Sequence, residues 1–409
     1  MARRRVVITG LAVATPLGLE VDTMWRAILA GACGISRLPV ELAAPELPVR
    51  IAGQVDDGVL ATGLKRYGIE ERDRNGQLGL YVVGRALEDA GYPVDGKAPL
   101  DLDVIVGSGH GGVAVSNEGT HAYVTGGWRR IRPTMVVRSM FNRPASLASI
   151  KYRLIGTSFV VSAACASGAV ALGEAFLRIA LGVSDGVVAA CCDTGLDRFT
   201  FAAWNRLGVL SRIPEPVQAS RPFDIKRDGL VIGEGAAAYL LETRERAERR
   251  GARIWAEVLG YGSASDATHL VRPDTSGQVR AIRSALGQAG VGPESLDYVS
   301  AHGTATELGD IAEAAALREA LGEHGGRVPV SNTKAQLGHL MGATAGVELA
   351  TTVLALHHRL LPACQNLDEP DPRCPLNFVR GVPLAVSARL ALKNTFAFGG
   401  TSCAVILAR

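Results

Sequence analysis

The sequence predicts an α/β protein in which short buried strands and amphipathic helices alternate along the whole chain. Apolar, β-branched runs such as 104–106 and 186–192 alternate with segments of helical spacing, which is the pattern of layered α/β folds. The chain has 48 glycines but only 5% aromatic residues, a composition typical of proteins with many tight turns. Its 409 residues, 47% of them hydrophobic, are enough for two halves with a large core.

The expected elements follow one another in a regular order. In the first half we expect strands at 6–8, 104–107, 186–192 and 236–241, and helices at 24–30, 77–90 and 244–250. Residues 33–75 contain three prolines and are expected to be an irregular surface segment, and 113–145 show no clear periodicity. From residue 254 a second cycle of strand, glycine turn and helix (276–289) loosely repeats this order. We therefore expect two domains, 1–250 and 251–409.

Charge and cysteine content exclude several classes of protein. A net charge of +3 without a long Lys/Arg run argues against nucleic-acid binding. No segment approaches the roughly 20 uninterrupted apolar residues of a membrane helix, and the arginines at 3–5 lead into a strand rather than a signal peptide. Seven cysteines, an odd number, predict reduced thiols in the cytoplasm. No Cys/His spacing resembles a zinc site, and we expect neither a metal nor a cofactor.

Cys165 lies where a buried strand is predicted to turn into a helix, within 160–176. Unpaired N–H groups at a helix start favour a thiolate, so this position suits a nucleophile and predicts a lowered cysteine pKa. The small residues Ala164, Ala166, Ser167 and Gly168 are expected to leave room for an acyl group. A buried structural cysteine is the alternative for a lone Cys in an apolar run.

Three further motifs carry groups able to do chemistry. His302 follows a short strand within 298–310, and Lys334 and His339 lie five residues apart around another strand-to-helix turn within 330–342. A glycine turn at 394–402 precedes the last strand. A histidine of this kind, taken alone, is more often a hydrogen-bonded core residue, and a lone lysine is more often a surface charge.

Together, the four motifs resemble the elongating β-ketoacyl-acyl-carrier-protein synthases of type II fatty acid and polyketide systems. The resemblance runs from the Val-Val-Ile-Thr-Gly start through Arg-Asp-Gly…Gly-Glu-Gly to the Phe-Gly-Gly-Thr end. It implies the thiolase fold, in which two βαβαβαββ halves related by a pseudo-twofold axis form a five-layered αβαβα core. It also implies a decarboxylative Claisen condensation, in which an acyl group held on the enzyme is joined to malonyl-acyl-carrier protein.

The resemblance assigns a role to each motif residue. Cys165 attacks the acyl thioester, and the backbone N–H groups of Cys165 and Phe398 form the oxyanion hole. Neutral His302 and His339 donate hydrogen bonds to the malonyl thioester carbonyl, while Lys334 orients His339 and keeps its pKa low. Supporting positions around these groups are Asp310, Glu348, Thr304 and Thr306; for the two acids a purely structural role is equally consistent with the sequence.

The chain departs from the family pattern at Ala163, where Thr is frequent, and at Ser402, where Asn is usual. More informative are His110 and Trp204, which with Phe398 are expected to line the acyl pocket. The family commonly has an aliphatic residue and a Phe at these two positions. A polar imidazole and a bulkier indole predict a short, unsaturated or polyketide-type acyl substrate, although the same changes are also consistent with drift in a pocket that still accepts straight chains.

The resemblance also implies partners. These are acyl- and malonyl-loaded acyl carrier protein, with Arg129, Arg130 and Arg206 as candidate contacts, and a second subunit in a homodimer or in a heterodimer with a chain-length-factor-like protein. A non-catalytic subunit of the chain-length-factor kind is the alternative function, but such subunits typically lack the cysteine that this chain has at 165. Enzymes that use coenzyme A thioesters are expected to show Cys-His-Asn or a second Cys instead.

Overall fold

The computed structural model describes residues 3–409 and contains the following elements. The strands are β1 (Val6–Ala14), β2 (Ile35–Arg37), β3 (Ile51–Gly53), β4 (Asp103–Gly107), β5 (Ser158–Val161), β6 (Gly186–Asp193), β7 (Gly235–Thr243), β8 (Ala256–Ser265), β9 (Tyr298–Ser300), β10 (Pro329–Ser331), β11 (Leu360–Leu361), β12 (Asn377–Phe378), β13 (Leu384–Ala385), β14 (Leu390–Phe396) and β15 (Thr401–Ala408). The α-helices are α1 (Val21–Leu29), α2 (Asp57–Arg66), α3 (Arg74–Asp89), α4 (Val113–Gly126), α5 (Met135–Ser139), α6 (Arg143–Tyr152), α7 (Ser167–Ala180), α8 (Arg198–Leu207), α9 (Pro216–Ala219), α10 (Arg244–Arg249), α11 (Thr275–Ala289), α12 (Glu307–Leu321), α13 (Lys334–Leu337) and α14 (Thr344–His358). Short 3₁₀ helices are η1 (Trp128–Arg130), η2 (Pro293–Ser295), η3 (Gly322–Gly326) and η4 (Met341–Ala343).

Eleven strands form one mixed sheet in the order β12-β10-β9-β14-β15-β8-β1-β7-β6-β4-β5. In the N-terminal half, β4 pairs in parallel with β5 and β6, and antiparallel pairs then join β6 to β7 and β7 to β1. The C-terminal half repeats this pattern: β9 pairs in parallel with β10 and β14, and antiparallel pairs join β14 to β15 and β15 to β8. The pairing confirms an α/β fold of two similarly built halves.

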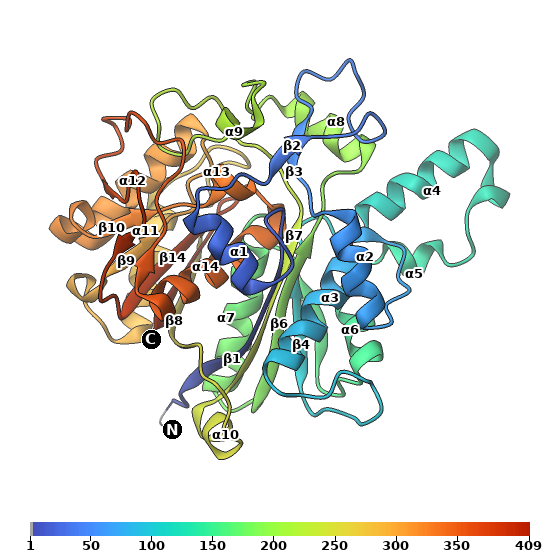
Figure 1. Cartoon of the computed structure of the whole chain (residues 1–409), viewed down its shortest axis with the longest axis horizontal. Coiled ribbons are helices and arrows are strands. Elements are labelled where there is room, and N and C mark those ends of the chain that lie inside the picture. The colour runs from blue at the N-terminus through green and yellow to red at the C-terminus, as the bar shows by residue number, and fades with distance from the viewer. Residues whose placement is uncertain (1–2) are drawn as a thin grey trace.

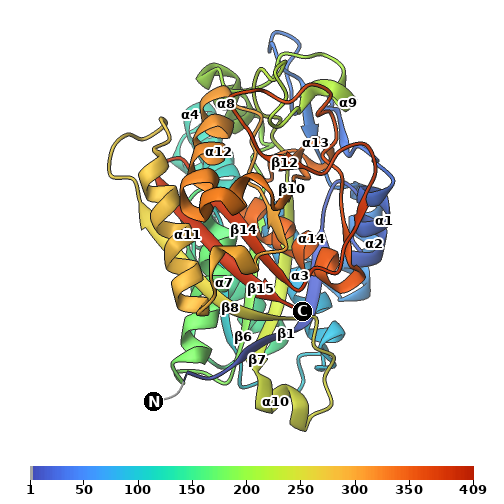
Figure 2. The ribbon, with the colours of Figure 1, turned by 90° about the vertical axis from the view of Figure 1, so that its left-hand side faces the viewer.

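Helices cover the sheet in layers (Figures 1 and 2). Between the halves lie α7 and α14, which contact each other; α7 packs on strands of both halves, and α14 packs on β7 and β14. On the outer side of the N-terminal half, α3 packs on β1, β6 and β7, and on the outer side of the C-terminal half α11 packs on β8 and β15. The two halves of the sheet form two of the layers, and the order helix, sheet, helix, sheet, helix is the five-layered core that the resemblance implies.

No gap in the sheet separates the two halves. Val6–Ile8 of β1 pair with β8 of the second half, and one apolar cluster contains residues from both halves, among them Leu172 on α7 and Val353 on α14. The boundary between 1–250 and 251–409 therefore stays a prediction from the sequence.

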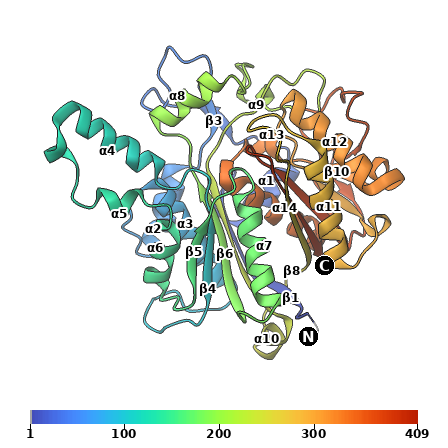
Figure 3. The same cartoon turned by 180° about the vertical axis from the view of Figure 1, so that it is seen from behind.

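Two segments contain more structure than their sequences predict. Residues 33–75 hold the short β2–β3 hairpin and α2, which Asp56 caps by accepting the Val59 N–H at 2.7 Å. Residues 113–145 hold α4, η1 and α5, which project from the body as an arm (Figure 3). Only Val115 and Gly119 of α4 are buried, so this helix has no apolar face to produce a periodic signal. None of the helices within 3–409 is long and apolar enough to cross a membrane.

Candidate functional site

The turn that carries Cys165 is held in a strained conformation between β5 and α7. Ala164 has a φ of 47°, in the left-handed region that residues with a side chain rarely adopt. Ser167, the first residue of α7, fixes this turn, since its Oγ accepts the Ala163 N–H at 2.9 Å and donates to the Ala164 carbonyl at 2.7 Å. Cys165 thus lies at the start of a 14-residue helix, in the strand-to-helix turn that the sequence predicts.

Small residues after Cys165 are buried, and Gly168 serves helix packing rather than acyl binding. Ala166, Ser167 and Gly168 are fully buried or nearly so, and a Cβ added to Gly168 would lie 2.8 Å from the backbone nitrogen of Gly346 on α14. The expectation that Gly168 leaves room for an acyl group is therefore wrong, because α14 fills the space over it. For Ala166 and Ser167, which are buried, it stays a prediction.

The Cys165 thiol is buried beside the expected oxyanion donor. Burial raises its pKa to about 11; a hydrogen bond from the Phe398 N–H and the charge of Lys334 act the other way without offsetting burial. The expected low thiol pKa is thus wrong for this site, because desolvation of the sulfur outweighs the effect of the helix start. The Phe398 N–H nevertheless lies close enough to the sulfur to act on its pKa, so it is near the carbon that the sulfur would attack, where an oxyanion donor is needed.

His339 is buried and its ring is fixed at one nitrogen. Its Nδ1 accepts the Met341 N–H at 3.0 Å and lies 3.1 Å from the Thr344 hydroxyl oxygen. Since Nδ1 acts as an acceptor, the neutral ring carries its proton on Nε2. Burial, followed by the nearby charge of Lys334, lowers the pKa of His339 to about 3.

A lysine fixes the position of the ring proton of His302, as a backbone N–H does for His339. The Lys334 ammonium, which can only donate, lies 3.3 Å from His302 Nδ1, so the proton of the neutral ring is again on Nε2. Among the residues described, nothing hydrogen-bonds to that buried Nε2. Burial and the charge of Lys334 lower the pKa of His302. The rings of His302 and His339 are 5.6 Å apart and nearly perpendicular, which gives the site two neutral N–H donors.

Lys334 supports His302, not His339. Its ammonium also contacts the His302 carbonyl and Glu348 Oε1, the latter at 2.5 Å, and the whole side chain is buried. In the described part of the chain no hydrogen bond joins Lys334 to His339, so the expected orienting contact is wrong; α13 directs the lysine towards β9 instead. The expected effect of its charge on the pKa of His339 is present.

Asp310 shapes the turn that follows His302. Its carboxylate accepts the Phe223 N–H at 2.7 Å and the Thr304 N–H at 2.9 Å. Burial raises its pKa to about 7, although the Phe223 N–H and the charge of Arg227 act against this rise. Asp310 does not line the cavity, whereas Thr304 and Thr306 do, with their hydroxyl oxygens 2.8 Å apart.

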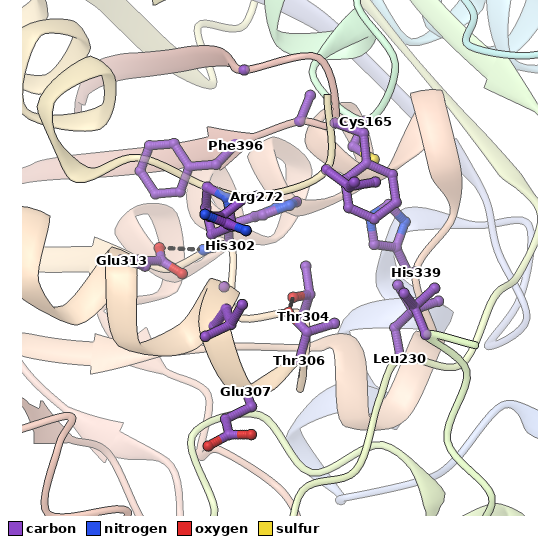
Figure 4. Close-up of a pocket in the computed structure, with 18 of the residues that line it drawn as sticks. Cys165, Leu230, Arg272, His302, Thr304, Thr306, Glu307, Glu313, His339 and Phe396 are labelled. Atoms are coloured by element: carbon purple, nitrogen blue, oxygen red, sulfur yellow. Dashed lines mark hydrogen bonds between the residues drawn. The ribbon is translucent and has the colours of Figure 1, made fainter. Parts of the chain in front are cut away.

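A cavity of about 290 Å³ brings the predicted residues together. Figure 4 shows Cys165 and His339 on one side, His302 with Phe396 on the other, and Thr304 and Thr306 facing the space from the turn after His302.

The far wall of the cavity is aromatic. Trp204 stacks on Phe398, with ring centroids 6.2 Å apart and an angle of 20°, and both line the cavity. His110 does not line it: the ring lies 6.4 Å from the Trp204 ring, and its Nδ1 is 3.2 Å from the buried carboxylate of Asp193. Burial lowers the pKa of His110, but the charge and hydrogen bond of Asp193 outweigh burial and raise it. Placing His110 in the wall of this cavity is therefore wrong.

The three candidate carrier contacts lie in two places. Arg206 is exposed on α8, whose neighbouring residues Trp204 and Gly208 line the cavity. Arg129 and Arg130 are exposed in η1, on the projecting arm (Figure 3). The sequence analysis missed a further exposed arginine, Arg272, which lines the cavity directly.

Three buried charged residues of the site were also missed. Asp193 accepts the N–H groups of Gly109 and Gly342, and Glu313 accepts the N–H of His302 at 2.7 Å. Lys393 on β14 lies 2.8 Å from Glu348. None of the three belongs to a local motif; only a charged residue inside an otherwise apolar run could have drawn attention to Asp193 and Lys393.

Comparison with known proteins agrees with this geometry. The family described as "Beta-ketoacyl synthase, N-terminal domain" matches residues 3–247, and "Beta-ketoacyl synthase, C-terminal domain" matches residues 255–368. The chain is 36% identical to 3-oxoacyl-[acyl-carrier-protein] synthase 2 of Coxiella burnetii, over 100% of this chain and 99% of that protein. It is 37% identical to the synthase of the same name from Vibrio cholerae, over the full length of both.

Solved structures give the same result. One is "AntDE:AntF (apo): type II PKS acyl-carrier protein in complex with its ketosynthase bound to the hexaketide", with a TM-score of 0.91, 28% identity and 99% of each chain covered. Another is "The ishigamide ketosynthase/chain length factor", with a TM-score of 0.91, 31% identity, and 100% of this chain and 99% of that chain covered. The chain therefore belongs to the β-ketoacyl synthase family.

Proposed function

We propose that this protein is an elongating β-ketoacyl-acyl-carrier-protein synthase that joins an acyl group on Cys165 to a malonyl unit with loss of carbon dioxide. One observation carries the proposal. His302 and His339 each have Nδ1 occupied by a donor, which leaves a neutral Nε2–H group on each of two histidines that line the same cavity as Cys165. A nucleophile beside two such donors suits acyl transfer followed by enolate chemistry.

In the first half-reaction, the Cys165 sulfur attacks the thioester carbonyl of the acyl-carrier. The N–H groups of Phe398 and Cys165 stabilise the negative oxygen of the tetrahedral intermediate. A C–S bond to Cys165 forms, the bond to the carrier sulfur breaks, and the proton of the Cys165 thiol ends on the released carrier thiol. Because burial disfavours the free thiolate, its negative charge is best formed only as the acyl group arrives.

In the second half-reaction, a malonyl-carrier loses carbon dioxide, and the electrons of the broken C–C bond form an enolate. The Nε2–H groups of His302 and His339 donate to the enolate oxygen. Neutral rings suit this role, since they stabilise the charge without giving up a proton. The enolate carbon then attacks the acyl-Cys165 carbonyl, the Cys165 sulfur leaves as a thiolate that takes up a proton from solvent, and a β-ketoacyl-carrier two carbons longer is released.

The proposal is tested by mass spectrometry of the protein after mixing with an acyl-carrier. We expect the acyl mass on the peptide that contains Cys165, and its disappearance, with formation of the lengthened product, when malonyl-carrier is added. C165A is the matched control and should carry no acyl group. Product formed by C165A would refute the role of the cysteine, and wild-type protein that neither acylates nor condenses would favour the non-catalytic subunit as the alternative.

Trp204 supports a proposal about the substrate. Its indole lines the cavity, stacks on Phe398 and has His110 behind it, so it takes up room that a long saturated chain would need. We therefore propose a short, unsaturated or polyketide-type acyl group. W204A should speed acylation of Cys165 by long saturated acyl-carriers about tenfold; wild-type protein that already accepts these chains rapidly would rule the proposal out.

Acyl carrier protein is the proposed delivery partner. Carriers of this kind are acidic, and Arg206 and Arg272 place exposed positive charge beside the cavity, where such a partner would dock. R206E should raise the KM for acyl-carrier several-fold at low salt. The pair R129E/R130E tests the arm in the same assay, and an unchanged KM would remove the arm from the carrier site.

A second subunit of the same fold is the other proposed partner. The edge strand β5 leaves one side without a neighbour in the sheet, and the arm exposes apolar side chains, among them Trp128 and Val136. Light scattering should give the mass of a dimer for the purified chain or for the chain co-purified with a homologous subunit. A monomer in both preparations would overturn this assignment.

A further inference from the structure

Lys393 is a buried lysine inside a strand, where an apolar residue would be ordinary. It lies in the middle of β14, paired with Ser300 of β9 on one side and Val405 of β15 on the other, and is 1% exposed. Burying an ammonium group is unfavourable unless several acceptors surround it. Packing alone therefore does not explain why a lysine is buried at this position.

Every group that Lys393 contacts is an acceptor. Its Nζ lies 3.4 and 3.3 Å from the carbonyl oxygens of Ser300 and Ala301, contacts the carbonyl of Asn394, and is 2.8 Å from Glu348 Oε2. An ammonium has three donors and no acceptor, so this set fits the charged form. Burial lowers the pKa of Lys393, while the charge of Glu348 acts in the opposite direction.

One carboxylate thus serves two ammonium groups. Glu348 meets Lys334 with Oε1 at 2.5 Å and Lys393 with Oε2 at 2.8 Å, and all three side chains are buried. Within residues 3–409, no other carboxylate lies within 4.0 Å of either ammonium; Glu313 instead accepts the N–H groups of His302 and Gly303. The array of two lysines and one glutamate therefore carries a net positive charge. The carboxylate of Glu313 opposes it from the His302 N–H, but the charges of Lys334 and Lys393 still act to lower the pKa of His302.

This array lies directly behind His302. Lys334 holds the ring and carbonyl of His302, while Lys393 holds the carbonyls of Ser300 and Ala301, the two residues that lead into it. A positive charge in this position disfavours an imidazolium and favours an enolate in front of the ring. Lys393 does not line the cavity, so it acts only through these neighbours.

We propose that Lys393 is a positioning residue for condensation: by sharing Glu348 with Lys334 it maintains a net positive charge behind His302 and anchors the backbone that carries this histidine. The inference rests on the proposed function. It differs from that function in assigning a role to a residue that touches neither substrate nor cysteine.

The first test compares the two half-reactions in K393M, which has nearly the same volume without the charge. We expect condensation with malonyl-carrier to slow about tenfold, and acylation of Cys165 and the KM for malonyl-carrier to change less than twofold. The exposed Lys97 provides the matched control K97M, expected to behave as wild type. A purely structural role would slow both half-reactions alike, and that result, or an unchanged condensation rate, would overturn the proposal.

The second test restores the charge. In K393M the remaining Lys334–Glu348 pair is neutral, whereas K393M/E348Q again carries one net positive charge. The double variant should therefore condense faster than K393M and come within about threefold of wild type; a double variant no faster than K393M would contradict the charge argument.

Protein quality and the proposed function are controlled separately. Thermal unfolding shows whether K393M is folded; if it is not, K393Q, which keeps an uncharged donor for the same carbonyls, replaces it in both tests. If neither variant folds, stability alone accounts for Lys393 and the proposal fails. Wild-type protein that does not condense overturns the proposed function and this inference with it, whereas a wild type that condenses no faster than K393M overturns this inference alone.

Discussion

The turns after β4 and β9 occupy corresponding places in the two halves, and each carries a histidine in an opposite electrostatic environment. His110 follows β4 and faces the carboxylate of Asp193, which raises its pKa despite burial. His302 follows β9 and faces the ammonium of Lys334, which adds to burial and lowers its pKa. The repeated strand pattern thus provides the position, and the charged partner decides what the imidazole can do there.

The neighbouring turns differ in the same way. After β5 the N-terminal half provides the proposed nucleophile Cys165, and after the corresponding β10 the C-terminal half provides Lys334 and His339. One half therefore carries the residue proposed to hold the acyl group, and the other carries the groups proposed to stabilise the enolate. The cavity therefore needs residues from both halves. Substituting one residue at a time tests whether the two halves have these different roles.

The largest expected effect is on the condensation rate, which should distinguish His302 from His110. H302A removes one of two donors to the enolate and should slow condensation about 100- to 1,000-fold. H110A, the matched change in the other half, should slow it less than fivefold with the same acyl-carrier, because His110 lies behind Trp204. Steady-state assays with malonyl-carrier measure both, and equal losses would show that the two histidines share one role.

A smaller effect is expected from the carboxylates that hold the turns. Asp193 accepts N–H groups from Gly109, His110 and Gly342, whereas Glu313 accepts those of His302 and Gly303. D193N places an amide NH₂ against such donors and should cost about 2–4 kcal/mol of unfolding free energy, with E313Q costing less. Urea denaturation measures both; a cost below about 1 kcal/mol for D193N would contradict the assigned contacts.

The sequence could predict the groups that follow strands in short motifs, but not what they contact. Cys165 and His302 each come directly after an apolar run, and His339 follows the short helix after β10, so their place at the cavity follows from topology. Lys334 illustrates the limit: it is five residues from His339, yet α13 directs it to His302, which is 32 residues away.

The roles of the buried charged residues could not be predicted either, because their partners are distant in the sequence. Asp193 and Lys393 look like interruptions of apolar strands, and their roles depend on partners brought together only by the fold, such as Glu348. The arm was missed because α4 is exposed almost all round and has no apolar periodicity. The local sequence pattern thus predicts where strands and turns lie. Which charged residues are buried, and which partners they have, can be seen only in the folded structure.

The smallest expected effect is a difference in how stability depends on pH. His110 has a raised pKa, so its contribution is present below about pH 6.5 and is lost as pH rises through the folded-state value. His302 has a lowered pKa, so its contribution is present above about pH 6.5 and falls as pH drops. The destabilisation by H110Q should therefore be larger at pH 5.5 than at pH 8.5, and that by H302Q should change in the opposite direction. Unfolding curves at the two pH values measure this, and shifts of the same sign would disprove the comparison.

The most direct measurement of the central claim is nitrogen NMR of protein labelled in the histidine rings. At pH 6 the structure predicts that His302 and His339 are both neutral with the proton on Nε2, while His110 is largely protonated. Assignment uses the single variants H302Q, H339Q and H110Q. An imidazolium signal from His302 or His339 at that pH, or a proton on Nδ1 of either ring, would contradict the account.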